Sequence, residues 1–432
     1  MAALVQRAPF RSDWAYAEDI PGTRCGPDDG PWPRSYQVLN EGEVWKEMRM
    51  LAKPQSVALG KGRADSVNFQ PSLSTRTQDR YVVKKLRVGT RDWSLTGVFD
   101  GHLGDVTVEH VAYHLPIIVA EFLQDAYKAD PTRLDDPVFI SDLFSRSIVA
   151  FDDAIAGDVL DLFGGIEGLA GYSDADIRRV INDHHQGGAN FRKARLNMYG
   201  TTALVALVDP DHGNLWVANL GDCQATLVTA SPTDPGAWDI KILTTEHNGY
   251  NDAEIERVRQ QHPNEPECVI DNRVLGALAP FRCLGDTPFK QPPEFTRRIL
   301  YNLSPGFPDT SPWEEFLVRN RTPPYISTEP EIVHTQLGVG SPPERSRFLI
   351  LASDGFVDLC SNEGQEKIVR DWARDMQNMT ADEETHPGSG NMALRLLRRA
   401  LGGEDRFKVS KVLTLNMDVA WIDDTAIVVQ TL

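Results

Sequence analysis

Three aspartates stand beside apolar, strand-like segments that lie far apart in the chain. Asp100 follows WSLTGVF, Asp354 follows RFLILAS, and Asp423 precedes the final run TAIVVQTL. A strand end can present a carboxylate rigidly. Several carboxylates together suit hard cations, which take oxygen ligands. Each Asp could also belong to an ordinary turn, so it is the recurrence of the pattern that indicates a cation site.

Two neighbours of Asp100 add to this pattern. Gly101 leaves the backbone carbonyl free to turn toward a cation, and His102 adds a titratable group. Taken alone, Asp-Gly-His is also compatible with a tight turn and a satisfied histidine. A second cluster, Asp183-His184-His185, lacks a preceding apolar strand, and we interpret it as a loop.

The bulk properties of the chain restrict its partners. The 432 residues carry a formal charge of −18, which opposes non-specific binding to nucleic acid. The five cysteines show no CxxC pair, which fits a reducing, intracellular compartment. No apolar run approaches the ~18 residues of a membrane span, so we expect none. The first residues form a poor organelle presequence.

The predicted elements come in blocks. Residues 1–35 form an extension without periodicity, and 42–53 have the spacing of an amphipathic helix. Residues 81–88 and 93–99 predict an antiparallel hairpin, and two long helices follow it. Strand-like runs recur at 201–209, 215–220 and 225–230. Because strands and helices are grouped and do not alternate, the pattern favours an α+β fold.

The order of these segments resembles the metal-dependent protein phosphatases of type 2C. FDGH, YGTTALVALV, LWVANLGD, LTTEHN, RVLGALAPFRCLGD, LILASDG and IDDTAIVV each resemble a family motif and follow the family's order over residues 66–432. The pyruvate dehydrogenase phosphatase branch is most similar, through Ala279-Pro-Phe-Arg282, Asp424 and a long insertion at about 291–321.

The resemblance implies a fold and a cofactor. The fold is two antiparallel β-sheets packed as a sandwich and flanked by helices on both sides, in one catalytic domain over 36–432. The cofactor is Mg²⁺ or Mn²⁺ as two ions, with a weaker third. Two such ions can share and acidify one water for in-line attack on phosphorus. The activity implied is serine/threonine protein phosphatase, acting on a phosphoprotein substrate, and we expect a monomer.

The resemblance also assigns roles by position. Asp100 would bridge the two ions, the carbonyl of Gly101 would bind one, and Asp354 and Asp423 would ligate the second. His102 stands where the family has the general acid that protonates the leaving oxygen. Three further positions match residues around the metals, although each could simply cap a turn: Asp79, which orients the attacking water, and Asp222 and Asp358, near the third ion.

The chain departs from the family pattern at two positions. Gln78 replaces a glutamate that accepts hydrogen bonds from metal-bound water, so the charge is lost. Ser74 stands where most relatives have a phosphate-binding arginine. Arg76, two residues on, points to the same face of an extended segment and could take over phosphate binding, or be an ordinary solvated arginine. These departures keep a second function open, that of a catalytically weak scaffold binding a partner protein.

The compartment is left between two possibilities. The family analogy suggests the mitochondrion, whereas the N-terminal residues argue only weakly for import, which leaves the cytoplasm open.

Overall fold

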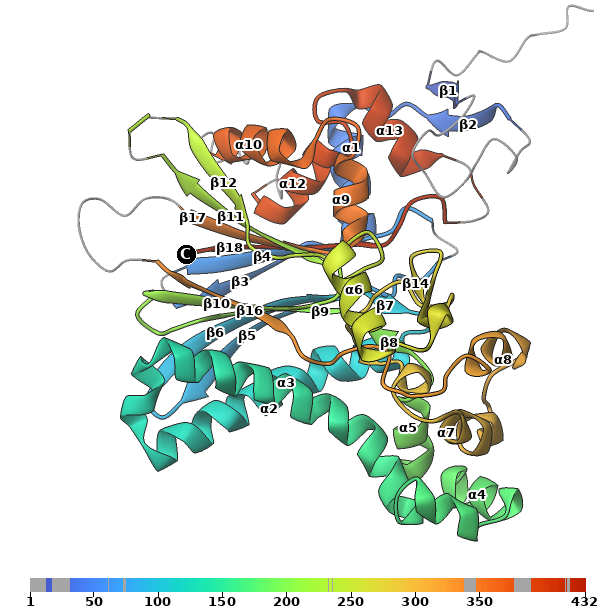
Figure 1. Cartoon of the computed structure of the whole chain (residues 1–432). Helices are drawn as coiled ribbons and strands as arrows, with labels where there is room; N and C mark the ends of the chain where they lie inside the picture. Colours follow the sequence, from blue (N-terminus) through green and yellow to red (C-terminus); the bar gives the residue numbers. More distant parts are fainter. Residues whose placement is uncertain are drawn as a thin grey trace, which may run out of the picture. The chain divides into compact units, whose positions relative to one another are not determined.

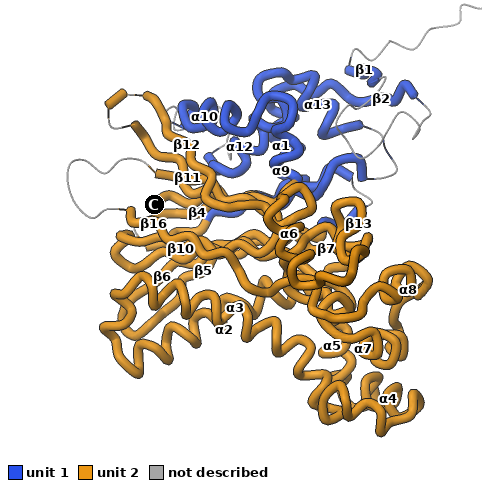
Figure 2. The backbone as a smooth tube through the Cα atoms, in the orientation of Figure 1, with its two compact units in different colours: residues 1–56, 65–77, 355–425 blue, residues 57–64, 78–354, 426–432 orange. Residues whose placement is uncertain are grey.

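The computed structural model describes residues 13–17, 32–60, 62–72, 75–231, 233–234, 236–337, 347–376, 390–415, 417 and 420–432. The chain divides into two compact units (Figure 2). Unit 1 comprises residues 1–56, 65–77 and 355–425, and unit 2 comprises 57–64, 78–354 and 426–432. Each is described by itself.

Two β-sheets form the centre of the fold (Figure 1). The five-stranded sheet has the order β16-β10-β9-β6-β5, and its neighbouring strands pair antiparallel. Its strands are β5 (Arg80–Val88), β6 (Arg91–Phe99), β9 (Ala203–Val208), β10 (Asn214–Leu220) and β16 (Glu331–Gln336). The predicted hairpin at 81–99 is therefore confirmed as β5 and β6.

The second sheet has six strands in the order β12-β11-β17-β18-β4-β3, and β12, β11, β17 and β18 pair antiparallel. These strands are β3 (Gln55–Leu59), β4 (Gly62–Phe69), β11 (Gln224–Ala230), β12 (Trp238–Ile242), β17 (Arg347–Ala352) and β18 (Thr425–Thr431). Side chains of both sheets share one buried cluster, which includes Val98, Leu204, Val217, Leu349 and Val428. The predicted sandwich is therefore confirmed.

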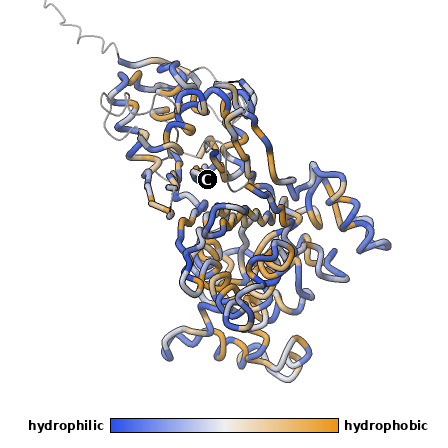
Figure 3. Tube along the Cα trace, turned by 90° about the vertical axis from the view of Figure 1, so that its left-hand side faces the viewer, coloured by the Kyte–Doolittle hydropathy of each residue, from blue (hydrophilic) through white to orange (hydrophobic). Residues whose placement is uncertain are grey.

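Two long helices cover the other face of the five-stranded sheet. They are α2 (Val106–Ala129) and α3 (Pro137–Leu160). Val111 and Leu115 of α2 and Phe144 of α3 pack in one cluster with Leu95 and Val205 of the sheet. The trace coloured by hydropathy shows hydrophobic residues along the strands and helices (Figure 3).

The prediction that no segment is long enough to span a membrane must be qualified. Helix α2 has the length and composition of a span, the one such helix in the described part of the chain. One face of this helix, however, is fully buried in the cluster beneath the sheet, as is normal for a core helix.

Unit 1 contains the helices α1 (Glu41–Ala52), α10 (Gln365–Asp375), α12 (Met392–Ala400), α13 (Arg406–Thr414) and most of α9 (Asp354–Cys360). Asn40 and Glu43 form a reciprocal cap that fixes the start of α1. Asp65 of β4 accepts a hydrogen bond of 2.7 Å from the amide of Met392 at the start of α12. This contact joins a helix to the six-stranded sheet, so both sheets carry helices and the αββα fold class is confirmed.

The predicted N-terminal extension contains a regular element. Strand β1 (Trp14–Ala17) pairs antiparallel with β2 (Arg34–Gln37), so the expectation of an irregular extension does not hold for these residues. The boundary at residue 36 and the single catalytic domain stay predictions.

The remaining elements surround the ends of the sheets in unit 2. The helices are α4 (Asp174–Ile181), α5 (Ala189–Arg195), α6 (Asp252–Gln261), α7 (Pro293–Arg298) and α8 (Ser311–Leu317). The predicted insertion at 291–321 holds α7 and α8. Short strands are β7 (Gly101–His102), β8 (Gly200–Thr201), β13 (Val269–Ile270), β14 (Arg273–Val274) and β15 (Leu284–Gly285).

Candidate active site

A small three-stranded sheet, β15-β8-β7, places His102 next to a buried aspartate. His102 pairs with Gly200, and Gly200 pairs with Gly285. Asp286 follows Gly285 and its carboxylate lies over Gly200, where a Cβ atom would stand 1.9 Å from its Oδ2. Position 200 therefore has to be glycine for this arrangement to form.

The His102 ring and the Asp286 carboxylate form a short, buried pair. Nε2 of His102 lies 2.6 Å from Oδ2 of Asp286, which is 1% exposed. Burial opposes protonation of His102, but the charge and hydrogen bond of Asp286, aided by Asp222, outweigh it and raise the pKa of His102. Burial would raise the pKa of Asp286, yet the same pair lowers it. The pair with Asp286 therefore favours the protonated form of His102.

The charges of several aspartates of unit 2 act on Cys223. Burial raises the pKa of the Cys223 thiol well above its usual value, and the negative charges of Asp100, Asp222 and Asp79 raise it further. Asp100 comes from the end of β6, Asp79 from the start of β5, and Asp222 from the turn between β10 and β11. The charges of three predicted carboxylates therefore act on one buried thiol, and their convergence on a metal stays a prediction.

A fourth predicted carboxylate acts on Asp222. Burial raises the pKa of Asp222 to about 7, and the charge of Asp354 adds to this, only partly offset by a hydrogen bond from Asn248. Asp354 directly follows Ser353 at the end of β17, as the sequence predicts. These two carboxylates repel each other, which is the situation that a bound cation relieves.

The backbone at Asp100 is held by two threonines. The amide of Asp100 donates to Oγ1 of Thr202 at 3.0 Å, and its carbonyl accepts from the Thr202 amide at 2.9 Å and from Oγ1 of Thr201 at 3.0 Å. At Gly101 a Cβ atom would come within 2.8 Å of the Gln78 carbonyl and of Val108. Only glycine fits this close approach. The predicted binding of a metal by its carbonyl stays a prediction.

Asp79 is 1% exposed and one of its carboxylate oxygens accepts the amide of Ala426 at 2.9 Å. This bond fixes Asp79 to the start of β18. The neighbouring Arg80 is engaged with Glu109 at 2.8 Å, so it is not an open phosphate-binding group.

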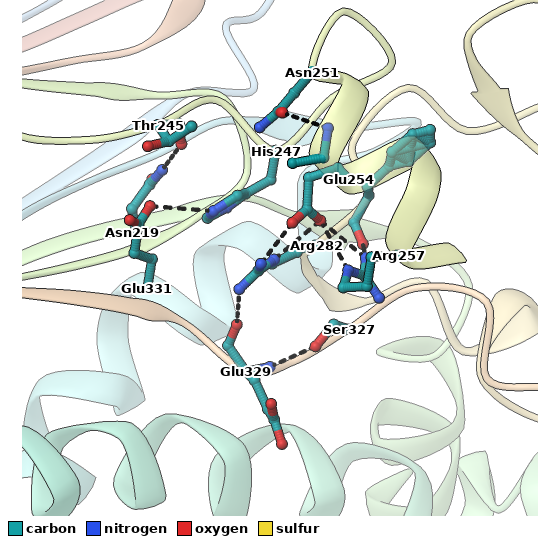
Figure 4. A network of polar contacts seen from close by, with 12 residues as sticks. Asn219, Thr245, His247, Asn251, Glu254, Arg257, Arg282, Ser327, Glu329 and Glu331 are labelled. Carbon is teal, nitrogen blue, oxygen red and sulfur yellow. Dashed lines mark hydrogen bonds and ion pairs between the residues drawn. The ribbon is translucent and has the colours of Figure 1, made fainter. Parts of the chain in front are cut away.

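A polar network that includes His247, Glu254 and Arg282 (Figure 4) also supports the turn that carries Asp222. Nδ1 of His247 accepts the amide of Gly221 at 3.2 Å, and its Nε2 faces Glu331 at 3.5 Å. Burial lowers the pKa of His247 to about 4, and the nearby charge of Arg282 contributes. His247 is therefore neutral at physiological pH, which leaves Nδ1 free to accept.

Arg282 also belongs to this network, through Glu254 of α6. Its Nη2 lies 2.5 Å from Glu254, and Arg257 binds the same carboxylate at 2.9 Å. Burial opposes ionisation of Glu254, but the hydrogen bonds from Arg282 and Arg257 and their charges lower its pKa to about 2. Arg282 thus has a structural role in the APFR segment that the sequence singled out.

The other predicted site residues belong to unit 1. Asp423 accepts the amide of Asp424 at 2.8 Å, and the side chain of Asp424 accepts from Gln70 at 2.8 Å. Asp358 is exposed on α9, and Arg76 is exposed. Ser74 lies outside the described residues. Convergence of Asp423 and Asp358 with the carboxylates of unit 2 stays a prediction.

A family model named protein phosphatase 2C matches residues 170–389, about half of the chain. The chain belongs to the protein phosphatase 2C family. The predicted resemblance is thereby confirmed.

The protein phosphatase 2C relatives include the predicted branch. The chain is 32% identical over 262 residues to the mitochondrial pyruvate dehydrogenase phosphatase 2 of Homo sapiens, covering 53% of this chain and 47% of that protein. It is 27% identical over 310 residues to the mitochondrial pyruvate dehydrogenase phosphatase 1 of Saccharomyces cerevisiae, covering 69% and 47%. The chain thus spans about half the length of these relatives.

Other comparisons cover more of both chains. A protein phosphatase 2C homologue of Schizosaccharomyces pombe is 29% identical over 363 residues, covering 78% of this chain and 73% of that protein. A solved serine-threonine phosphatase 2C from Toxoplasma gondii is 15% identical with a TM-score of 0.47, covering 88% of this chain and 98% of that chain.

Protein phosphatase 2C enzymes depend in general on magnesium or manganese, and the donor chemistry of unit 2 fits such a cation. Its aspartates offer carboxylate oxygens, the ligand type that both metals prefer. The repulsion between the charges of Asp222 and Asp354 would be relieved by a bound cation. Within the described residues, no three His, Cys, Asp or Glu side chains already form a metal-ligand cluster.

Sequence reasoning did not single out Asp286 as a candidate site residue. A signal was present, because Leu284-Gly285-Asp286 repeats the tripeptide Leu220-Gly221-Asp222. What the sequence did not reveal is the pairing of β15 with β8, which brings Asp286 to His102. Asp183-His184-His185 lies in a 3-10 turn, His184–Gln186, in agreement with the loop interpretation.

Proposed function

We propose that this chain is a metal-dependent serine/threonine protein phosphatase that hydrolyses phosphoserine and phosphothreonine. The observation that supports the proposal is electrostatic: the charges of Asp100, Asp222 and Asp79 all act on the buried Cys223, and that of Asp354 acts on Asp222. A scaffold without catalytic function has no physical need to hold so many carboxylates together.

Each predicted site residue would have one role in the reaction. Asp100, the carbonyl of Gly101, Asp354 and Asp423 would hold two divalent ions, with Asp222 and Asp358 near a third. The bound ions supply charge stabilisation and a nucleophile at neutral pH. Asp79, fixed to the start of β18 by its bond to Ala426, would orient the attacking water.

His102 would donate a proton to the leaving serine or threonine oxygen. It is suited to this role because Asp286 keeps the ring protonated and holds Nε2 at 2.6 Å. General acid catalysis of this kind contributes roughly 10²- to 10⁴-fold to a rate.

The substrate would be a phosphoprotein, and the names of two relatives favour a subunit of pyruvate dehydrogenase. The insertion would help to select it. Arg297 of α7 binds Glu314 of α8 at 2.7 Å, and Tyr301 donates to the same carboxylate at 2.9 Å. These bonds fix the insertion in one shape, as a docking surface requires. We propose that the chain acts as a monomer, in the mitochondrion or the cytoplasm.

Arg76 would bind the substrate phosphate in place of the arginine that Ser74 replaces. Arg76→Ala should raise KM for a phosphopeptide roughly tenfold while changing kcat less, because a charge-assisted hydrogen bond to phosphate is lost. Arg87→Ala is the matched control, since Arg87 is also exposed and pairs with Asp92 on its own hairpin. An unchanged KM in Arg76→Ala would exclude this role.

The proposed function is tested by hydrolysis of a phosphothreonine peptide and of para-nitrophenyl phosphate with and without millimolar Mn²⁺. We expect turnover that depends on the metal and that falls roughly 10³-fold or more in Asp100→Asn and in Asp354→Asn. Asp142→Asn should keep wild-type turnover, because Asp142 is exposed on α3 and pairs with Arg146.

Two substitutions support an alternative, a weak phosphatase-like scaffold that binds a partner protein. Gln78 lacks the charge of the family glutamate, and Ser74 lacks the phosphate-binding group. Absence of turnover at any metal concentration, with folding intact, would favour the scaffold. Metal-dependent turnover that Gln78→Glu increases would favour a phosphatase with reduced metal affinity.

A further inference from the structure

Unit 1 contains a cavity of about 360 Å³ among helices α1, α10 and α12. It is within the size range of small-molecule sites, and no predicted catalytic residue lines it. The polar and aromatic side chains that matter for its chemistry are Glu41, Trp45, Asp375, Arg395, Arg398 and Arg399.

Three of these side chains are arginines on one helix. Arg395, Arg398 and Arg399 lie three and four positions apart on α12, so they share one face of the helix. Their clustering is unusual in a chain with a net charge of −18. Arg398 is only 5% exposed, and arginine is rarely buried to this degree unless its charge and its N–H groups are satisfied.

The carboxylates that line the cavity satisfy only part of this requirement. Nη2 of Arg398 donates to Glu41 at 2.9 Å, and Nη2 of Arg399 donates to Asp375 at 2.7 Å. Nη1 of Arg398 and Nε of Arg399 are buried and have no acceptor among the described residues. A buried N–H of a charged group is costly when it has no acceptor. These two N–H groups therefore indicate that an atom of a ligand accepts their hydrogen bonds.

The surroundings hold the guanidinium groups in place. The Arg398 guanidinium lies 4.7 Å from the centre of the Trp45 ring, and that of Arg395 lies 5.9 Å from it. The Trp45 indole N–H donates to Glu41 at 2.8 Å, so the ring and the carboxylate are themselves fixed. Preorganised guanidinium groups beside an aromatic ring bind an anion more strongly than the guanidinium groups of mobile surface arginines do.

We propose that this cavity binds the phosphate or carboxylate group of a small molecule, through Arg398 and Arg399. Arginine forks recognise both oxyanions. Three lining carboxylates balance the three arginines, but one of them is loosely held. Glu404 is 4.0 Å from Arg398 and its side chain is 88% exposed, so an incoming anion can replace it. The site is separate from the residues of the proposed function and does not depend on that function.

Isothermal titration of inorganic phosphate into the full chain tests the proposal. The protein is first freed of divalent ions by chelation and gel filtration, and ionic strength is kept constant with sodium chloride. We expect one saturable site in the wild type, weakened about tenfold or more in Arg398→Gln and in Arg399→Gln, because each loses charge-assisted hydrogen bonds. A parallel titration with acetate decides between the two oxyanions, and tighter binding of either one supports the site.

Arg406→Gln is the matched control, because Arg406 is exposed in the same unit and does not line the cavity. It removes the same charge and should leave the affinity unchanged. Arg399→Gln decides the outcome if Arg398→Gln fails to fold, since the side chain of Arg399 is 28% exposed and tolerates change better. Wild-type protein that binds neither anion saturably, or equal affinity in Arg399→Gln and Arg406→Gln, would overturn the proposal.

Discussion

Two turns with the same Leu-Gly-Asp sequence place their aspartates in opposite electrostatic environments. Asp286 faces the cationic ring of His102, and that pair lowers its pKa against the effect of burial. Asp222 faces the carboxylate of Asp354, and burial with this repulsion raises its pKa to about 7. The residue type is the same in both turns, so the partner that the fold supplies decides the charge of each aspartate and the chemistry it can perform.

The two turns are supported in parallel ways. In each, the glycine amide donates to a buried side chain, to Nδ1 of His247 at Gly221 and to Asp152 at Gly285, where the distance is 2.7 Å. Asp152 in turn binds Nζ of Lys290 at 2.7 Å. One turn is therefore held by a neutral group and the other by an ion pair.

Among changes to the two turns and their supports, replacing Asp286 should have the largest effect. In Asp286→Asn the negative charge beside His102 is lost, so the pKa of His102 falls and less of the protonated acid is present at neutral pH. We expect kcat for a phosphothreonine peptide to fall roughly 10³-fold, within the range of general acid catalysis. The alkaline limb of the pH–rate profile should move to lower pH.

The contrast with His102→Gln makes this result specific to the pair. Because Asp286 acts through His102, the double variant should be no slower than His102→Gln alone. Additive losses, or an alkaline limb that does not move in Asp286→Asn, would contradict the assigned role.

Breaking the ion pair under the second turn should mainly reduce stability. Lys290→Met leaves Asp152 buried without its cation, because the two side chains are only 11% and 7% exposed. We expect a loss of about 3 kcal/mol or more in the free energy of unfolding, measured by urea denaturation. Lys193→Met, which removes an exposed partner of Asp158, should cost less than about 1 kcal/mol. Equal losses of stability in the two variants would show that burial of the Lys290–Asp152 pair does not increase the cost of breaking it.

Because His247 is neutral where it supports the turn at Gly221, it should make the free energy of unfolding depend on pH. Burial holds the pKa of His247 near 4, below its value of about 6.5 in the unfolded chain. Below pH 6.5 the unfolded state binds a proton that the folded state does not, so this contribution to stability is lost as the pH falls from 6.5 to 4.

The measurement compares wild type with His247→Gln by urea denaturation at pH 7 and pH 4. The wild type should lose on the order of 2 kcal/mol more than the variant between these two pH values. His185→Gln, at an exposed position, should behave as wild type. A wild type that loses no more stability than His247→Gln would show that the histidine is not held neutral.

The sequence predicted the fold class and marked candidate site residues because these signals are local. Alternating apolar runs marked β5, β6, β9, β10 and β11, and Asp-Gly or Asp-Asp after or before such runs marked Asp100, Asp354 and Asp423. The family motifs then supplied the sandwich, which periodicity alone could not. The predicted position of Asp222 near a third metal stays a prediction, although the charge of Asp354 acts on it.

What the sequence could not supply is the pairing of short segments. Strands β7, β8 and β15 have two residues each, too few for a periodic signal, yet they bring Asp286 to His102. Burial had no local signal either. His247 lies in LTTEHN and Arg398 in NMALRLLRRAL, and nothing in these segments indicates that one is neutral and the other enclosed.

The smallest effect in this comparison concerns the cysteine near each turn. Sγ of Cys283 donates to Oδ2 of Asp286 at 2.9 Å, and His102 binds the same oxygen. Cys223 instead lies 3.1 Å from Oγ1 of Thr202 and contacts neither member of the pair. Of these two cysteines, therefore, it is Cys283 that competes with His102 for the carboxylate.

In Cys283→Ala the Asp286 carboxylate loses a hydrogen bond that stabilises its charge when the His102 ring is neutral. The hydrogen bond between Asp286 and protonated His102 should therefore become stronger. The alkaline limb of the pH–rate profile should move to higher pH by about half a unit, equivalent to about 0.7 kcal/mol, with kcat changed less than about threefold. This shift is opposite in direction to that of Asp286→Asn. Cys223→Ala should leave the limb in place, and a limb that moves equally in both cysteine variants would mean that the two turns do not differ as their contacts indicate.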